Sequence, residues 1–237
     1  MQNNSVLIIG AEKGLGLGLA ETWLSRGWEV FATHLPNGDV AQLNALQKRH
    51  PDTLTIGSID VTRAEQIPPL LAQMGGKAFD VIFLVAGIFG PLHQSVLQAS
   101  DDEFQQIMLT NTFGPIRLAR SLIPLLKAKA TLAFMASHRA SIAAHTQQGI
   151  ELELYRASKV ALNMLARGIF LDIQEAGHTV LSIHPGWVAT AMGTLDGAVE
   201  AEIDVATSVQ GMVEVVEQYR HANNHLFIDY KGEYWPW

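Results

Sequence analysis

The sequence Val6-Leu7-Ile8-Ile9-Gly10-Ala11-Glu12-Lys13-Gly14-Leu15-Gly16 decides the fold. Its four consecutive apolar residues predict a strand buried on both faces, because a half-exposed strand would alternate apolar and polar side chains. The glycines that follow permit a tight turn and a close approach of the backbone to phosphate. A helix that begins near Gly14 points its first N–H groups toward the same place, which favours an anion there. The alternative is a strand–helix turn that needs glycines only for its shape.

The rest of the chain repeats the strand–helix alternation. Further strands are expected over 28–33, 54–59, 79–85, 131–136, 179–183 and 226–228, and helices over 15–26, 40–49, 64–74, 101–127, 150–173 and 205–219. Pro68-Pro69 should interrupt the third of these helices. Apolar strands that alternate with helices predict an α/β fold with one domain over residues 1–237. Its parallel sheet of about seven strands should be doubly wound, with helices on both faces.

The composition excludes several classes of protein. A hydrophobic fraction of 48% with 16% charged residues fits a well-buried domain of 237 residues and argues against disorder. The net charge is -7 and no run of Lys or Arg occurs, so nucleic acid and anionic membranes are poor partners. The absence of Cys excludes disulfides, thiolate metal sites and cysteine nucleophiles. Without a signal peptide or a long apolar run, the chain is expected to be cytoplasmic.

The end of the second strand bears on the choice of dinucleotide. Thr33-His34-Leu35 offers no carboxylate that would bind a ribose 2′-hydroxyl and repel a 2′-phosphate. Lys13, within the glycine loop, could meet that phosphate. Both features favour NADP(H), although NAD(H) stays possible and Lys13 could equally be an ordinary exposed lysine.

Tyr155-Arg156-Ala157-Ser158-Lys159 carries a candidate acid/base group. Tyr155 and Lys159 are four residues apart, so they lie on one face of the expected helix. An ammonium beside a phenol favours the phenolate, so Lys159 should lower the pKa of Tyr155. Taken alone, such a pair is more often a solvated surface contact.

The glycine loop and this pair together resemble the short-chain dehydrogenase/reductase family, over essentially the whole chain. Asn111-Thr112-Phe113-Gly114 resembles the family's Asn-x-x-Gly segment, and Pro185-Gly186-Trp187-Val188-Ala189-Thr190 resembles its segment beside the nicotinamide. The end of the chain, with Phe227-Ile228-Asp229-Tyr230-Lys231-Gly232, resembles the branch of C-factor-like proteins and sniffer-type carbonyl reductases. The resemblance implies a Rossmann-type, nucleotide-binding oxidoreductase that transfers hydride between a nicotinamide cofactor and a carbonyl or alcohol.

The resemblance also implies residue roles. Tyr155 acts as the general acid/base, Ser137 polarises the carbonyl, Lys159 binds the nicotinamide ribose, and Asn111 anchors a water in a proton relay. The implied cofactor-binding residues are Gly10, Lys13, Gly14, Leu15, Gly16, His34, Asp60, Val61, Ala86, Gly87, Tyr155, Lys159, Pro185, Gly186, Val188 and Thr190. No metal site is expected, because the histidines lack ligand spacing.

The candidate walls of a substrate pocket are mostly apolar, which favours an apolar or aromatic carbonyl compound. They are Phe89, Leu92, His145, Trp187 and Met192. Each could equally well only pack its loop. The loop at about 187–202 is expected to be a mobile substrate lid.

Two departures from the family pattern stand out. Leu84 and Val85 occupy positions where the family has asparagines, so packing should replace a polar contact near the cofactor loop. Ser137 lies farther before Tyr155 than is usual, and residues 144–152 are expected to form a lid or a pocket edge. The first hypothesis is an NADP(H)-preferring carbonyl reductase that forms a homodimer or homotetramer. The alternative is a C-factor-like signalling or regulatory protein that binds a dinucleotide with little turnover.

Overall fold

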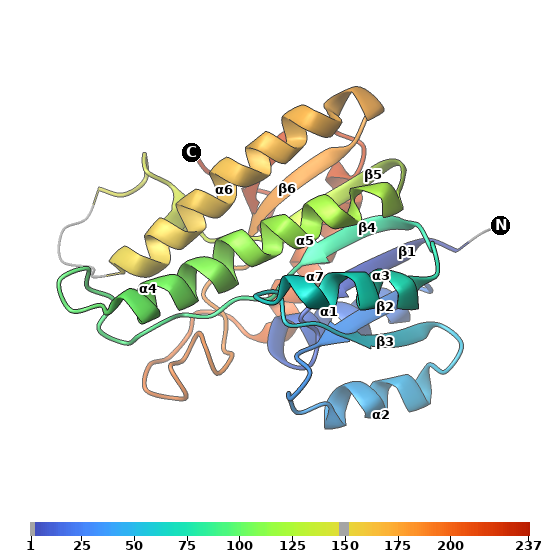
Figure 1. Cartoon of the computed structure of the whole chain (residues 1–237), viewed down its shortest axis with the longest axis horizontal. Coiled ribbons are helices and arrows are strands. Elements are labelled where there is room, and N and C mark those ends of the chain that lie inside the picture. Colours follow the sequence, from blue (N-terminus) through green and yellow to red (C-terminus); the bar gives the residue numbers. More distant parts are fainter. Residues whose placement is uncertain (1–2, 147–151) are drawn as a thin grey trace.

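A computed structural model describes residues 3–146 and 152–237. Seven parallel strands form one sheet in the order β3-β2-β1-β4-β5-β6-β7 (Figure 1). The strands are β1 (Ser5–Ile9), β2 (Glu29–His34), β3 (Leu54–Ser58), β4 (Phe79–Leu84), β5 (Leu126–Met135), β6 (Thr179–His184) and β7 (His225–Asp229). The predicted doubly wound parallel sheet of seven strands is confirmed. The limits of the single domain, 1–237, stay a prediction.

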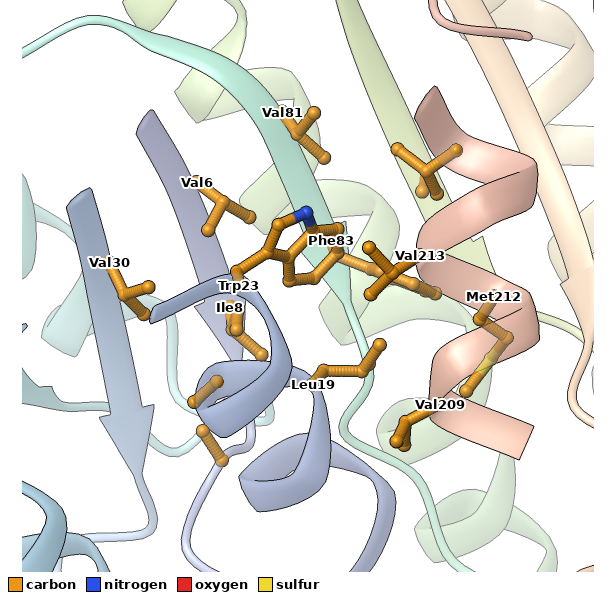
Figure 2. Close-up of a cluster of buried hydrophobic side chains, with 14 of the residues drawn as sticks. Val6, Ile8, Leu19, Trp23, Val30, Val81, Phe83, Val209, Met212 and Val213 are labelled. Atoms are coloured by element: carbon orange, nitrogen blue, oxygen red, sulfur yellow. The ribbon is translucent and has the colours of Figure 1, made fainter. Parts of the chain in front are cut away.

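Helices cover both faces of the sheet and bury an apolar core on each. One face carries α1 (Gly14–Ser25), α2 (Ala41–Arg49) and α7 (Val205–Tyr219). Figure 2 shows this core, in which Trp23 of α1 packs edge-on against Phe83 of β4, with ring centroids 6.2 Å apart. The other face carries α3 (Ile67–Met74), α4 (Asp101–Met108), α5 (Gly114–Leu122) and α6 (Glu153–Ile173). Helix α6 runs alongside α4 and α5 (Figure 1).

Three predicted elements differ from those observed. Pro68 and Pro69 do not interrupt a helix but begin α3, since the first turn of a helix needs no N–H partners. The helix expected over 101–127 is divided by a π-helical turn (Leu109–Phe113) and ends in a 3₁₀ turn that contains Pro124. Strand β5 therefore begins at Leu126, five residues earlier than expected. The predicted start of α6 near residue 150 lies outside the described residues.

No helix in the described parts of the chain combines the length and the apolar character needed to cross a membrane. The loops that follow β1, β4, β5 and β6 all lie at the carboxyl edge of the sheet, where ligands of parallel sheets bind.

Candidate active site

The glycine loop is held tightly between the ends of β2 and β4. Ala11 N–H donates to the Thr33 carbonyl at 2.7 Å, and Ala86 N–H donates to the Ile9 carbonyl at 2.9 Å. A Cβ on Gly16 would lie 1.9 Å from the Gly10 carbonyl oxygen, and Gly10 itself has a φ of +90°. Only glycine fits these two positions, so the loop backbone is fixed before any ligand binds.

The loop after β6 meets the glycine loop. A Cβ on Gly14 would lie 3.5 Å from the Thr190 Cγ2 atom, which places the segment from Pro185 to Thr190 over the start of α1. The Ser208 hydroxyl donates to the Pro185 carbonyl at 2.6 Å and ties this segment to α7. The two loops together form a cradle at the carboxyl edge of the sheet. Lys13 stands at its rim as an exposed residue.

The end of β4 completes the cradle by packing rather than by polar contacts. Leu84 is buried in the core and Val85 packs against the core on the opposite face. Asn111, in the π-helical turn, takes over the polar role: its Oδ1 accepts from Ile88 N–H at 2.7 Å and its Nδ2 donates to the Ile88 carbonyl at 2.8 Å. The side chain of Asn111 is thus a clamp on this loop, and its role in a water relay stays a prediction.

Asn111 and Lys159 approach the same glycine. A Cβ on Gly87 would lie 3.2 Å from Asn111 Oδ1 and 3.5 Å from Lys159 Nζ. Lys159 is buried and donates to the Met135 carbonyl at 2.9 Å. The ends of β4 and β5 and the helix α6 therefore converge on one point at the rim of the cradle.

Ser137 and Tyr155 meet beside this point. Ser137 follows β5, and the hydrogen bond between its side chain and Tyr155 acts to lower the pKa of that tyrosine. Burial of the phenol acts more strongly in the other direction and raises the pKa of Tyr155 to about 12, although the residue as a whole is only half-buried. Burial also lowers the pKa of Lys159 to about 8.

The expected lowering of the Tyr155 pKa by Lys159 is therefore wrong for the protein chain. Lys159 Nζ lies 5.7 Å from the centroid of the Tyr155 ring and is directed at the Met135 carbonyl. Burial of the phenol is the largest influence on this pKa, and the influence that opposes it is the hydrogen bond with Ser137 rather than the ammonium of Lys159. Tyr155 consequently keeps its proton at neutral pH.

Gln94 is a residue of the site that the sequence did not indicate. It is buried at a left-handed φ of 55° in the loop after β4. Its Oε1 accepts from Tyr155 N–H at 2.9 Å, and its Nε2 donates to the Phe89 and Pro91 carbonyls at 2.8 Å each. The Phe89 ring stacks on the Tyr155 ring at 5.8 Å. One amide group thus fixes the start of α6 and the loop that covers Tyr155.

Two histidines join the ends of β5 and β6. A ring nitrogen of His138 lies 2.9 Å from one of His184, and the Trp235 ring packs against both. Burial lowers the pKa of His138 to about 4 and that of His184 to about 3. The pair is therefore neutral at pH 7 and links the Ser137 segment to the Pro185 segment.

The other predicted site residues lie at the same edge of the sheet. Asp60 Oδ1 accepts from the Thr62 N–H and hydroxyl groups, which shapes the turn that presents Val61 after β3. His34 ends β2, where its Nδ1 lies 2.8 Å from the Leu35 carbonyl. Of the expected pocket walls, Phe89 stacks on Tyr155. Leu92, Trp187 and Met192 are 77%, 42% and 41% exposed.

The extra residues before Tyr155 fall partly on 147–151, which lie outside the described residues. Ala144, His145 and Thr146 line a cavity of about 240 Å³. In the loop at 187–202, Trp187 Nε1 donates to the Gly193 carbonyl at 2.7 Å, and movement of that loop stays a prediction. Among the described residues, no group of three or more His, Asp or Glu side chains is arranged to hold a metal ion.

A family model described as enoyl-(acyl carrier protein) reductase matches residues 10–228. The chain belongs to the short-chain dehydrogenase/reductase family. Its members are oxidoreductases that use a nicotinamide dinucleotide, and the chain is accordingly an NAD(P)-dependent oxidoreductase.

Similar proteins cover the chain from end to end. A carbonyl reductase from Pseudomonas aeruginosa PAO1 in complex with NADP is 35% identical over 100% of both chains, with a TM-score of 0.90. The carbonyl reductase Sniffer of D. melanogaster is 29% identical over 100% of both chains, with a TM-score of 0.87. C-signal from Myxococcus xanthus is 32% identical over 67% of this chain and 92% of its own length. The resemblance to this branch is thus confirmed.

Proposed function

We propose that the protein is an NADP(H)-preferring carbonyl reductase with Tyr155 as the general acid. The observation that carries the proposal is the convergence of Ser137, Tyr155 and Lys159 at the rim of the glycine-loop cradle. A hydride acceptor seated on that rim would place its carbonyl oxygen between two hydroxyl groups. The likeness to two carbonyl reductases supports the same reaction.

The residues would divide the chemistry as follows. A dinucleotide held in the cradle by the glycine loop would provide the hydride for the carbonyl carbon. Ser137 donates a hydrogen bond to the carbonyl oxygen as negative charge develops there, and Tyr155 gives that oxygen its proton. A tyrosine with a pKa of about 12 is protonated at neutral pH and can therefore act as the acid of a reduction. Lys159, held against Met135, would bind the hydroxyl groups of the nicotinamide ribose.

Two features of the chain support NADP(H). The end of β2 carries no carboxylate, and Lys13 is exposed at the start of α1, where a 2′-phosphate could meet it. The Pseudomonas relative contains NADP. Glu12 argues against NADP(H), because a carboxylate near the end of β2 would repel a 2′-phosphate. Its Oε2 is buried without a partner among the described residues, and its Cγ would lie 3.9 Å from a Cβ on Gly38.

The test is an NADPH-oxidation screen of the purified protein against aldehydes, ketones and quinones. Saturable turnover of at least one compound class is expected, with a higher kcat/KM for NADPH than for NADH. A higher value for NADH would contradict the cofactor assignment alone. A protein that binds NADPH but reduces nothing would favour the alternative, a signalling or regulatory protein with little turnover. The likeness to C-signal does not by itself indicate an enzymatic activity.

Exposed apolar side chains on α4, the π-helical turn and α6 favour the expected homodimer or homotetramer. They are Phe104, Phe113, Met164, Leu165 and Leu171. Such a patch is typical of a subunit interface. Light scattering after size-exclusion chromatography would give the mass, and Met164→Lys should shift a dimer toward the 25.9 kDa monomer. The cytoplasmic location stays a prediction.

A further inference from the structure

The cavity of about 240 Å³ lies next to the catalytic residues but is lined by their sequence neighbours. Arg139 stands two residues after Ser137, and Arg156 directly follows Tyr155. The rings of His138 and Trp235 form an aromatic wall, with centroids 5.3 Å apart and planes tilted by 43°. The mechanism proposed above uses none of these four side chains.

The charge of this cavity is unbalanced. Arg156 Nε and Nη2 are buried and have no hydrogen-bond partner among the described residues. No ion pair within residues 3–146 and 152–237 includes Arg139 or Arg156, although the protein has a net charge of -7. The charge of Arg139 contributes to the lowered pKa of Arg156, after burial. The two guanidinium groups therefore repel each other, and no carboxylate among the described residues pairs with either of them.

Partly desolvated guanidinium groups without a counter-charge are unfavourable, so something of opposite charge would stabilise them. Guanidinium groups bind carboxylates and phosphates through paired N–H donors. The cavity is too small for a dinucleotide and large enough for a small organic acid, whose apolar part could lie on the rings of His138 and Trp235.

We propose that Arg139 and Arg156 bind the oxyanion group of a small organic acid in this cavity. The ligand class is a carboxylate or phosphate attached to a compact apolar or aromatic body. The oxyanion group belongs either to the carbonyl substrate itself or to a separate anion that binds beside the substrate. This inference goes beyond the proposed function, because the binding can be measured without turnover.

The first experiment is calorimetric titration of the NADP⁺-saturated protein with benzoate and, separately, with inorganic phosphate. Prior saturation with NADP⁺ keeps the phosphate probe from the glycine loop. Saturable binding is expected, and both Arg139→Gln and Arg156→Gln should weaken it about tenfold or more, the loss expected for one charge-assisted hydrogen bond. Benzyl alcohol, which has no charge, should not bind.

Arg49→Gln is the matched control. It removes the same charge from α2, where Arg49 pairs with Glu21 on the surface, far from this cavity in the sequence and in the sheet order. Circular dichroism and Tm of each variant show whether it is folded. The proposal is overturned if neither anion binds saturably, or if both arginine variants bind as tightly as Arg49→Gln.

The second experiment separates the two sources. Under turnover, 4-carboxybenzaldehyde is compared with benzaldehyde. A higher kcat/KM for the acid, lost in both arginine variants while benzaldehyde is reduced as before, assigns the anion to the substrate. Benzoate binding without such an advantage assigns it to a separate ligand, and both results support the site. If no carbonyl compound is reduced, the proposed function fails while the titration still tests this inference.

Discussion

The two sides of the active site are built differently. The cradle between the ends of β1, β4 and β6 consists of backbone, and glycines at positions 10, 14, 16 and 87 bring its segments together. The opposite side, built from the loops after β4 and β5 and from the start of α6, consists of side chains such as Gln94, His138 and Arg156. The cradle needs a fixed shape for a common ligand, whereas the side-chain wall can vary with the substrate.

The largest expected effect separates chemistry from cofactor binding. Tyr155→Phe keeps the ring that stacks on Phe89 but removes the hydroxyl near Ser137. Loss of a general acid should lower kcat/KM about 10³-fold, while the Kd for NADPH stays within twofold. Steady-state kinetics and NADPH fluorescence titration measure the two quantities. Turnover close to that of the wild type would show that Tyr155 is not the general acid.

The second prediction tests whether NADPH binding depends on the fixed shape of the cradle. Gly16→Ala places a methyl group 1.9 Å from the Gly10 carbonyl oxygen, so the loop must move. A displacement of this size should weaken NADPH binding about 100-fold. Gly168→Ala in α6 is the control, because its methyl group would meet only Arg120 Nη2 at 3.9 Å. It should bind NADPH normally and be about 0.5 to 1 kcal/mol more stable. Equal NADPH affinity in both variants would contradict a fixed loop.

The third prediction concerns the side-chain wall. Gln94→Glu still accepts from Tyr155 N–H but loses both donor bonds, to the Phe89 and Pro91 carbonyls. The loop over Tyr155 should loosen, and kcat should fall about tenfold with an unchanged KM for NADPH. Gln98→Glu, an exposed neighbour, is the matched control. A Gln94 that only stabilised the fold would instead lower Tm without changing kcat in the folded protein.

These two sides also differ in how far the sequence predicts them. The strand, glycine loop and helix that begin the chain were found because consecutive residues determine them, and α7 was predicted with its observed bounds, Val205–Tyr219. The predicted start of strand β5 is too late, because the helix is expected to continue to Lys127 and the lysines at 127 and 129 interrupt the apolar pattern of a buried strand. Local patterns thus set the elements, and their ends depend on sheet pairing.

Gln94 could not be found from the sequence, since its partners lie in its own loop and at Tyr155, and an isolated glutamine gives no local signal. Arg139 and Arg156 could be suspected from the sequence, because Arg139 lies two residues after Ser137 and Arg156 directly follows Tyr155. The missing information was the position of Trp235, which brings the end of the chain against His138. The direction of the Tyr155 pKa shift was also missed, because burial is a property of the folded chain.

The fourth prediction uses pH to test the wall. The folded-state pKa values of His138 and His184, about 4 and 3, lie below the ordinary value of 6.5. The unfolded chain therefore binds more protons between pH 6.5 and 4, so stability falls as the pH falls through this range. Urea unfolding at several pH values should show this loss, with a shallower slope in His138→Asn. The same slope in both proteins would show that other groups cause the acid sensitivity.

The smallest expected effect lies at the rim of the cradle, where we propose that the exposed Lys13 meets the cofactor. Lys13→Gln removes a charge that is open to solvent, and exposed charges contribute little. We expect kcat/KM for NADPH to fall only about 1.5-fold to fivefold, with that for NADH unchanged. Glu12→Gln should act in the opposite sense, because its buried Oε2 would repel a 2′-phosphate. The ratio of the two kcat/KM values in each variant measures both effects. If the cradle recognises NADPH by backbone shape alone, that ratio will be unchanged in both variants, and the charges of Lys13 and Glu12 do not contribute to the choice of cofactor.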